Sequence, residues 1–392
     1  MSEWKEYRLG DILSIKSGFS YQGKFIGTGN SLLLGMGCVS FKEKFLMSGA
    51  RPYSGPYDER YKVHSGDIVL ATRQQSDNLP ILAMPAMVPD SLKDKDIVIG
   101  TNLYKVEITD TTFSSVFIYW LLKTKRYVNY IAGVKTGTTV SMVTKKNVED
   151  FTFFAPTDPK EREEIASIIS SLDDKIAVNK KICENLEAQA QALFKHWFVD
   201  FAPFKDGKFV ESELGLIPEG WRVGTLGDIA EFKRGKTITK SDVKEGLIPV
   251  VAGGLEPAYY HNQSNTSSRV ITISGSGANA GFTRMYYQPV WASDCSYVDN
   301  ATTSFLHTAY CYLLTNKKKV DALQWGAAQP HVYAKDINKL PLVIAPLDVL
   351  NHFEELISGM FDLIEVNDKE TLRLAFLRDT LLPKLMSGQI KL

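Results

Sequence analysis

Trp4-x4-Leu9-Gly10-Asp11-Ile12 occurs a second time in this chain, at the same spacing, as Trp221-x4-Leu226-Gly227-Asp228-Ile229. A Lys-x-Gly string follows each copy, beginning at Lys16 and again at Lys233. Repetition of one opening is typical of a chain that contains the same structural unit twice. The sequence therefore predicts two similar globular domains.

A long helix is predicted after each domain, because apolar residues recur there at alternating steps of four and three. Asp158 is suited to cap the first helix and Pro159 to occupy its first turn. In the second helix, Pro383 is predicted to end or kink the helix before Leu385. The first ladder consists of Ile165, Ile169, Leu172, Ile176, Asn179, Cys183, Leu186, Ala190, Leu193 and Trp197, and the matching positions of the second are Phe353, Ile357, Met360, Ile364, Asn367, Thr371, Leu374, Arg378, Leu381 and Leu385.

A helix of about 40 residues is about 60 Å long at 1.5 Å per residue, and alone in water it is unstable unless its apolar stripe is covered. The two stripes are expected to cover each other. Antiparallel pairing would place the domains at opposite ends of the helices, whereas parallel pairing would crowd them. We therefore predict an α+β fold with an internal pseudo-two-fold repeat, in which two similar α/β domains are joined by two long antiparallel helices that form a coiled coil.

Two asparagines interrupt the apolar ladders. Antiparallel alignment would place Asn179 opposite Thr371 and Asn367 opposite Cys183. Buried asparagine in such a seam costs stability but specifies the register. We predict that Asn179 and Asn367 fix the register of the helices, and the alternative is that both side chains reach solvent.

The predicted boundaries divide the chain into a first domain (1–157), a central helix (158–204), a second domain (205–346) and a C-terminal helix (347–392). Both domains are expected to contain a buried strand followed by a helical stretch, and both then continue through a glycine that opens a polar loop. The strand, helix and glycine are 66–72, 115–130 and Gly137 in the first domain, and 268–274, 301–323 and Gly326 in the second.

Composition excludes several classes of protein. Of the 392 residues, 44% are hydrophobic and 23% charged, which suits two or three domains with buried cores. The sequence has no segment that resembles a signal peptide and no run of the ~18 apolar residues that a membrane span needs, so we expect a cytoplasmic protein without a membrane partner. The four cysteines form no Cys-x-x-Cys pair, which argues against a disulfide framework and a zinc site.

The charges balance in number but not in distribution. Basic and acidic residues number 45 each, which argues against a simple polycation. Acidic residues are absent from 111–148, where the basic residues are Lys123, Lys125, Arg126, Lys135, Lys145 and Lys146. Similar basic stretches occur in the second domain at 233–244 and 317–335. Each domain is therefore predicted to have a basic face for phosphates, and the alternative is a solvated charged surface.

Motifs for catalysis are not recognisable. Gly235-Lys236-Thr237 resembles the end of a phosphate-binding P-loop, but Ala230 stands where its first glycine is required. The glycine-rich stretch 274–281 resembles a dinucleotide fingerprint, but a strand is predicted after it instead of the required helix. Neither an (Asn/Asp)-Pro-Pro-Tyr string of an amino-methylating enzyme nor a His-Glu-x-x-His zinc motif occurs. The sequence therefore favours a protein that binds and positions its partners.

Three strings resemble conserved segments of the specificity (S) subunits of type I restriction-modification systems. Leu216-Ile217-Pro218-Glu219-Gly220-Trp221-Arg222-Val223, with the Leu-Gly-Asp-Ile string after it, resembles the entry to the second recognition domain of that family. Trp197-Phe198-Val199-Asp200-Phe201 resembles the central conserved segment, and Leu381-Leu382-Pro383-Lys384-Leu385-Met386-Ser387-Gly388 resembles the C-terminal one. The resemblance covers the whole chain.

The resemblance implies that the two domains are target recognition domains, each of which reads one half of a split, asymmetric sequence in double-stranded DNA. It also implies a non-catalytic chain without a cofactor of its own. S-adenosylmethionine is expected on two modification (methyltransferase) subunits, and ATP and Mg on restriction subunits that translocate and cut DNA. The two helices are expected to set the spacing of the domains and to dock these subunits.

Base recognition in the major groove requires paired donors and acceptors, such as arginine for guanine and asparagine or glutamine for adenine, whereas lysine mostly contacts phosphate. We predict such contacts just past the buried strand and in the loop after the glycine of each domain, and the alternative is that these polar loops face only water. The predicted residues are Arg73, Gln74, Gln75, Ser141, Lys145 and Lys146 in the first domain, and Ser274, Ser276, Asn279, Arg284, Gln329, His331 and Lys335 in the second.

Two other classes of function remain open at this stage. A DNA-modifying enzyme with its own recognition domains would bind S-adenosylmethionine as an isolated chain. A structural coiled-coil adaptor would show no salt-sensitive affinity for DNA.

Overall fold

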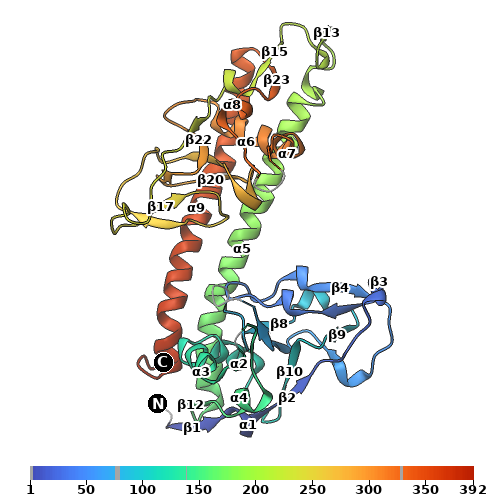
Figure 1. Cartoon of the computed structure of the whole chain (residues 1–392), viewed down its shortest axis with the longest axis vertical. Helices are drawn as coiled ribbons and strands as arrows, with labels where there is room; N and C mark the ends of the chain where they lie inside the picture. The colour runs from blue at the N-terminus through green and yellow to red at the C-terminus, as the bar shows by residue number, and fades with distance from the viewer. Residues whose placement is uncertain (1–2, 76–79, 138, 327–329) are drawn as a thin grey trace. The chain divides into compact units, whose positions relative to one another are not determined.

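The computed structural model describes residues 3–75, 80–137, 139–326 and 330–392 of the chain (Figure 1). The chain divides into two compact units. The first unit comprises Met1–Ala177 with Leu372–Leu392, and the second comprises Val178–Thr371. Each unit therefore contains one domain together with a part of both long helices.

An antiparallel four-stranded sheet, in the order β2-β10-β6-β8, lies in the core of the first unit. Its strand β6 is buried at all four residues, as the apolar run predicts. A second sheet has the order β4-β3-β9-β5, in which β3 and β9 are parallel, and β1 pairs with β12. The strands are β1 (Trp4–Arg8), β2 (Leu13–Ser17), β3 (Ile26–Leu34), β4 (Ala50–Tyr53), β5 (Lys62–Val63), β6 (Ile68–Ala71), β7 (Arg73–Gln74), β8 (Pro85–Met87), β9 (Ile97–Ile99), β10 (Leu103–Ile108), β11 (Ser141–Met142) and β12 (Thr152–Pro156), and the short helices are α1 (Leu9–Ile12), α2 (Ser115–Leu122), α3 (Lys125–Val134) and α4 (Lys145–Glu149).

The second unit repeats this plan. A four-stranded antiparallel sheet has the order β16-β22-β19-β20, a smaller sheet has the order β18-β17-β21, and β15 pairs with β23 as β1 pairs with β12. The strands are β13 (Phe209–Ser212), β14 (Gly215–Pro218), β15 (Arg222–Thr225), β16 (Lys233–Arg234), β17 (Ile248–Val251), β18 (Tyr259–His261), β19 (Val270–Ser274), β20 (Thr283–Tyr286), β21 (Trp291–Ala292), β22 (Cys295–Asp299) and β23 (Pro341–Ile344), and the short helices are α6 (Leu306–Thr315), α7 (Lys317–Asp321) and α8 (Ala334–Ile337).

The predicted helical stretch of each domain is interrupted in the structure. In the first domain it breaks after α2, where the Thr124 side chain accepts a hydrogen bond from the backbone N–H of Tyr127 and so starts α3. In the second domain it begins later than predicted, at Leu306, and breaks at Asn316 between α6 and α7. Both breaks coincide with short polar runs, 123–126 and 315–319, across which the predicted helical stretches had been extended.

Two helices of 40 residues each, α5 (Pro159–Phe198) and α9 (Leu347–Met386), pass through both units. The start of α5 agrees with the prediction, since Asp158 accepts a hydrogen bond from the backbone N–H of Lys160 at 2.9 Å. The prediction for Pro383 was wrong about where the helix ends, because α9 continues to Met386. A proline this close to the C-terminus removes one backbone hydrogen bond, and the buried Leu385 and Met386 hold the last turn in the core.

Within each unit the two helices run antiparallel. In the second unit, Cys183 of α5 donates to the carbonyl of Ile364, whereas further along α5 the ring of Phe198 lies 4.8 Å from that of Phe353, so rising numbers on one helix meet falling numbers on the other. In the first unit, Asp173 pairs with Arg378, while earlier residues of α5 share a buried cluster with Leu382 and Leu385.

The two asparagines of the seam differ in their surroundings. Asn179 is fully buried, and its Nδ2 donates to Oε2 of Glu370 on α9 at 2.6 Å, one residue from the predicted neighbour Thr371. Asn367 is half-buried, and its Nδ2 donates to the carbonyl of Leu363 on its own helix at 2.7 Å. The structure thus shows a hydrogen bond between the two helices at Asn179 and not at Asn367.

The repeated tryptophans explain why the openings are duplicated. Trp221 packs against aromatic residues at and just after the end of α5, with ring distances of 5.7 Å to Phe198 and 5.5 Å to Phe201. Trp4 lies against Gly388 just after α9, where a Cβ on the glycine would come within 3.2 Å of the indole ring. In each unit the opening of the domain therefore packs on the end of a long helix.

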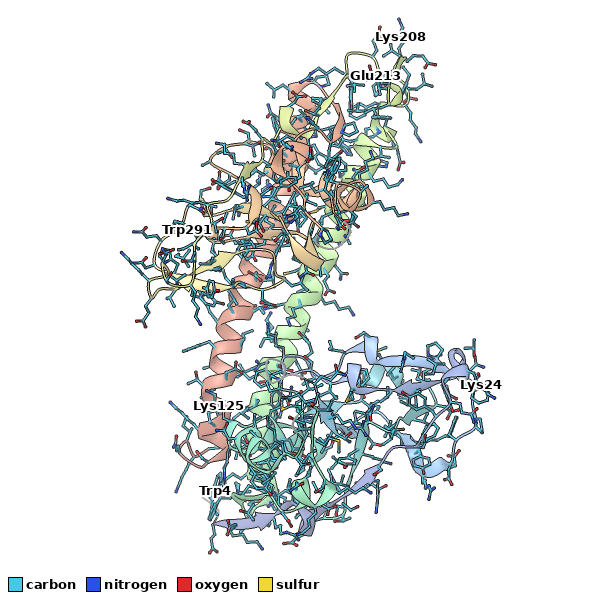
Figure 2. All side chains as sticks on the ribbon, viewed as in Figure 1. Trp4, Lys24, Lys125, Lys208, Glu213 and Trp291 are labelled. Carbon is cyan, nitrogen blue, oxygen red and sulfur yellow. The ribbon has the colours of Figure 1, made fainter. Side chains whose placement is uncertain are left out.

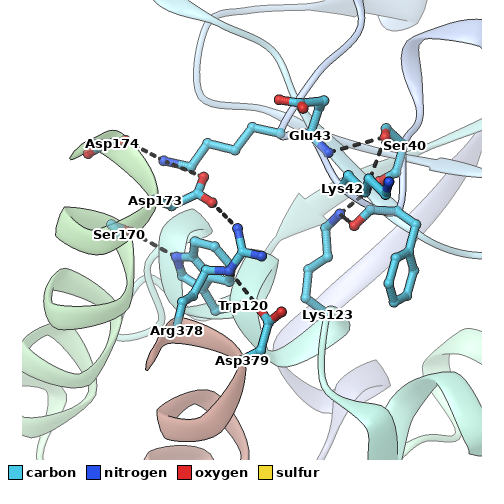
Figure 3. A network of polar contacts seen from close by, with 12 residues as sticks. Ser40, Lys42, Glu43, Trp120, Lys123, Ser170, Asp173, Asp174, Arg378 and Asp379 are labelled. Atoms are coloured by element: carbon cyan, nitrogen blue, oxygen red, sulfur yellow. Dashed lines mark hydrogen bonds and ion pairs between the residues drawn. The ribbon is translucent and has the colours of Figure 1, made fainter. Parts of the chain in front are cut away.

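Polar contacts attach the first domain to the helix segments of its own unit (Figure 3). Lys44 forms an ion pair with Asp174 of α5 at 2.6 Å, and the indole N–H of Trp120 donates to Ser170 Oγ at 2.8 Å. Arg378, a charged residue in the apolar ladder of α9, is accommodated because it pairs with Asp173 of α5. The ladder is therefore kept despite this charge.

In the second unit a carboxylate of α9 attaches the domain. Glu354 accepts hydrogen bonds from the backbone N–H groups of His307 and Thr308 at 3.0 and 2.9 Å, and so satisfies the start of α6. Nδ1 of His307 lies 2.8 Å from Glu354, and its ring stacks on Phe361 at 4.5 Å. Burial by itself would raise the pKa of Glu354, but the hydrogen bonds and charge of His307 and the bonds from Thr308 outweigh it and lower that pKa.

Candidate nucleic-acid interface

The loop after Gly137 is held against the end of the buried strand in the first domain. Thr136 and Met142 exchange two backbone hydrogen bonds, of 2.9 and 2.8 Å, which close the base of this loop. Gly137 has a φ of +92°, a conformation that favours glycine, at the sharp turn that follows. β11 then pairs antiparallel with β7, which places Ser141 beside Gln74 and Met142 beside Arg73.

The second domain builds the same loop at the equivalent place. Trp325 and His331 exchange two backbone hydrogen bonds of 2.9 Å, and Gly326 has a φ of +93°. His331 forms a bridge with Ser276, just past β19. In both domains the structure therefore brings the two predicted regions together, the residues past the strand and the residues of the glycine loop.

We call these two surfaces the first and second loop platforms. The first platform consists of Arg73, Gln75, Ser141, Met142 and Lys145, and the second of Ser276, Asn279, Trp325, His331 and Lys335.

Not every predicted contact residue faces outward. Gln74 is 6% exposed, and its Oε1 accepts the backbone N–H of Leu82 at 3.1 Å. Ser274 is 3% exposed, and its hydroxyl donates to the carbonyl of Gly253 at 3.0 Å. Gln74 thus ties the chain at Leu82 to the strand end beside the first platform, and Ser274 ties the end of β19 beside the second platform to Gly253.

The other residues of the first platform are more accessible. Arg73 and Gln75 are exposed, and Ser141 and Lys145 are half-buried. Arg73 makes no ion pair with any described residue. Lys146 is exposed, but its ammonium forms an ion pair with Asp150 at 2.6 Å, so its charge is partly compensated.

Aromatic rings and cations lie together on the second platform. The rings of His331 and Tyr333 stack at 6.0 Å, and the ammonium of Lys335 lies 5.6 Å from the Tyr333 ring. The hydroxyl of Ser276 donates to Asp294. Asn279 is half-buried at the end of a 3₁₀ turn, and Gln329 lies outside the described residues.

Arg284 is engaged elsewhere in the second unit. Its guanidinium lies 4.8 Å from the Tyr286 ring and donates to the carbonyl of Leu255 at 3.3 Å. Burial raises the pKa of Asp368 on α9, and the charge of Arg284 opposes that rise. Arg284 therefore belongs to the contacts around β20 and is not part of the second platform.

The basic face of the first domain is smaller than the lysine run suggests. Lys125 is exposed at the start of α3 (Figure 2). Lys123 instead donates to the carbonyls of Ser40 and Phe41 at 2.8 and 2.9 Å, and burial lowers its pKa to about 8 (Figure 3). Its ammonium therefore holds the 40–41 segment and does not contact solvent freely.

Sequence reasoning did not select Met142 and Trp325. Met142 is 42% exposed and Trp325 is 67% exposed, and each lies at the base of its glycine loop. A base-reading residue was expected to be polar, so both apolar residues were passed over. Trp325 directly precedes Gly326, and this position is the feature in the sequence that could have identified it, whereas Met142 lies five residues after Gly137 and had no such signal.

Among the described residues, no group of three or more His, Cys, Asp or Glu side chains is arranged to hold a metal ion. Three of the cysteines are buried and Cys183 is half-buried. Burial raises the pKa of the Cys38 and Cys295 thiols to about 12. Within the described ranges, no helix is long and apolar enough to cross a membrane.

Two repeated α/β domains with equivalent loop platforms, connected through two long helices, define a class of protein that presents two recognition surfaces. A family model for the type I restriction modification DNA specificity domain matches residues 1–188 and 218–369. The chain belongs to this family and contains two of its domains in tandem.

Individual relatives agree with this assignment. The type I restriction enzyme MjaIX specificity subunit of Methanocaldococcus jannaschii is 29% identical over 300 residues, which cover 71% of this chain and 69% of that protein. The HindI specificity subunit of Haemophilus influenzae is 24% identical over an alignment that covers 100% of both chains. The crystal structure of a type I restriction-modification system S subunit from M. genitalium matches with a TM-score of 0.61 and 17% identity, covering 98% of this chain and 96% of that one.

These comparisons confirm the predicted family and fold class. The chain is a specificity subunit of a type I restriction-modification system with two DNA recognition domains.

Proposed function

We propose that each domain reads one half of a split, asymmetric sequence in double-stranded DNA through its loop platform. The proposal rests on one observation. In both domains an equivalent glycine loop pairs with residues at the end of the equivalent buried strand, but the side chains on the two loops differ. A common backbone with different donors, acceptors and apolar groups would read two different half-sequences.

The proposed roles follow from side-chain chemistry. Arg73 and Gln75 in the first platform, and Asn279 and His331 in the second, would contact base edges. Lys145 and Lys335 would contact phosphates and so contribute affinity without sequence preference. Gln74 and Ser274 would act indirectly, by holding the loops from which these residues project.

We also propose that α5 and α9 set the spacing of the two half-sites. Both helices are continuous over 40 residues and shared by both units, and their seam is packed in each unit. Two domains on one face of B-DNA would read positions about one turn, roughly 34 Å, apart. A stiff pair of helices would therefore favour one spacer length over others.

The partners in this proposal are two modification subunits and restriction subunits, and exposed apolar residues of α9 suggest where one partner binds. Leu363 and Val366 are exposed in the second unit, and Leu372 and Phe376 are exposed in the first. Large apolar side chains on the outer surface of a helix are typical of residues that another protein covers. We assign them to the docking of the modification subunits.

The specificity subunit would itself be non-catalytic and hold no cofactor. S-adenosylmethionine would bind to the modification subunits, and ATP and Mg to the restriction subunits. Titration of the isolated chain with S-adenosylmethionine, followed by calorimetry, tests this: no heat of binding is expected, and stoichiometric binding would favour the alternative of a DNA-modifying enzyme.

The main experiment is to sequence the methylated sites in cells that carry the complete system. A two-part motif with a spacer of constant length is the expected result. A continuous motif would contradict the division of labour between the domains, and methylation without sequence preference would contradict recognition by this chain.

A further inference from the structure

Trp325 differs from every other tryptophan of the chain. The sequence contains six tryptophans, and the other five are buried or half-buried. Trp325 is 67% exposed, and its ring stacks on no ring of a described residue. A large apolar ring that is exposed to water is suited to contact another molecule, because burial of its apolar area is favourable.

The backbone presents Trp325 in a defined position. The two hydrogen bonds of 2.9 Å to His331 close the base of the loop, and Gly326 turns the chain directly after it. Two further hydrogen bonds tie the returning strand of the loop to the end of β19: Gly277 donates to the carbonyl of Pro330 at 3.0 Å, and Val332 donates to that of Gly275 at 3.1 Å. A side chain placed in this way loses little conformational entropy when it binds.

The surroundings of Trp325 are those of a nucleic-acid contact. His331 lies beside it, the ring of Tyr333 stacks on His331, and the ammonium of Lys335 is 5.6 Å from the Tyr333 ring. Polar and cationic groups around one exposed apolar ring suit a polyanion that carries an isolated apolar group.

Resting on the proposed function of the second platform, we propose that Trp325 reads a thymine of the second domain's half-site by packing on its 5-methyl group. In a stacked duplex the bases expose their edges and not their faces. The thymine methyl is the apolar group on the major-groove edge, and apolar side chains distinguish thymine by contact with it. The polar residues of the platform cannot supply this contact.

The experiment uses the full chain with its modification subunits and a duplex that carries the methylated motif. In a second set of duplexes, deoxyuridine replaces thymine in one half-site at a time, which removes the methyl and keeps the hydrogen-bonding groups. We expect the wild-type complex to lose about fourfold in affinity on deoxyuridine in one half-site, as burial of one methyl group predicts. Trp325→Ala should bind the thymine duplex as weakly as the wild type binds the deoxyuridine duplex. This variant should no longer distinguish the two duplexes.

Two variants control this result. Trp325→Phe keeps an apolar ring and should still discriminate thymine from deoxyuridine. Met142→Ala removes the exposed apolar residue at the base of the loop in the first domain, and it should still discriminate thymine from deoxyuridine in the half-site of the second domain. Because Trp325 is exposed, Trp325→Ala should melt at the wild-type temperature. Equal discrimination by the wild type and Trp325→Ala, or a motif without thymine in either strand of that half-site, would overturn the proposal. A wild-type complex without any sequence preference would instead overturn the proposed function.

Discussion

Arg73 and Lys145 belong to the same platform but present different chemistry. Arg73 is exposed beside Met142 at the end of the buried strand, whereas Lys145 is half-buried in the first turn of α4. A guanidinium can form two hydrogen bonds to a guanine edge, whereas an ammonium acts as a point charge toward phosphate. The two residues therefore offer a direct separation of base recognition from backbone contact.

Arg73→Ala is expected to relax the choice of base at one position of the first half-site, with a loss of about 1–3 kcal/mol on the cognate site only. Lys145→Ala is expected to weaken binding to all sequences and to reduce the salt slope of binding by about 1. Affinities for cognate and random duplexes, measured over a series of salt concentrations, distinguish the two. Equal losses on both duplexes for both variants would contradict these roles.

At the scale of elements, the two domains are attached to the helices by different groups. The first uses Lys44 against Asp174 of α5, and the second uses His307 against Glu354 of α9. Glu354 also satisfies the first N–H groups of α6, so one carboxylate holds the domain and caps a helix. The stability of this contact depends on the charge of Glu354.

Glu354→Gln is expected to lower the free energy of unfolding by about 2 kcal/mol at neutral pH, because hydrogen bonds to a buried carboxylate are lost. The folded-state pKa of Glu354 lies below its ordinary value of 4.5, so the folded state binds fewer protons than the unfolded state in acid. The contribution of Glu354 is complete above pH 4.5 and is lost as the pH falls through the folded-state pKa.

Denaturant unfolding of the wild type and Glu354→Gln between pH 3 and pH 7 measures this dependence. The difference between their free energies of unfolding should stay constant down to about pH 4.5 and become smaller below that pH. Glu355→Gln, which changes an exposed neighbour on the same helix, should unfold like the wild type throughout. A difference between the wild type and Glu354→Gln that grows toward acid would contradict the assignment.

The seam of the long helices supports a second prediction at this scale. Asn179 is buried and bonds across the helices, whereas Asn367 bonds its own helix. Asn179→Leu should stabilise the chain but loosen the register, because an apolar seam accepts several alignments. Asn367→Leu should change neither property appreciably. Thermal melting measures the stability, and small-angle scattering measures the separation of the domains. An unchanged scattering curve for the Asn179→Leu, Asn367→Leu double variant would contradict a role of these residues in fixing the register.

At the scale of the whole molecule, the long helices would serve the proposed partners as well as the domains. Their buried face is used within the chain, and α9 still exposes Val366 and Phe376, the latter 75% exposed. Apolar area that the chain leaves uncovered is available to a partner, and a central aromatic residue commonly contributes most to such an interface.

Phe376→Glu and Val366→Glu are expected to weaken assembly with the modification subunit by about tenfold or more, since a charge would replace a buried apolar contact. Leu247→Glu changes a residue that is 88% exposed outside the long helices and should leave assembly intact. Analytical ultracentrifugation of the chain with its partner measures the effect. Wild-type assembly by either helix variant would exclude its residue from the docking of the partner.

Local patterns in the sequence were sufficient to predict the domain plan of this protein. The duplicated Trp and Leu-Gly-Asp-Ile strings, the two apolar ladders and the loop glycines follow from local spacing, and each is found in the structure where the spacing placed it. Periodicity specifies which face of a helix is buried, and a positive φ favours glycine, so both features can be recognised without tertiary contacts.

The contacts of individual polar residues depend on how the whole chain folds. Lys123 and Gln74 read as surface groups in the sequence, yet one holds the carbonyls of the 40–41 segment and the other accepts the N–H of Leu82. Trp325 was not among the predicted contact residues, yet it is 67% exposed beside the loop glycine. Burial depends on what other segments pack against a residue, and those segments lie far away in the sequence, so the residues that form each platform emerge only when the chain is folded.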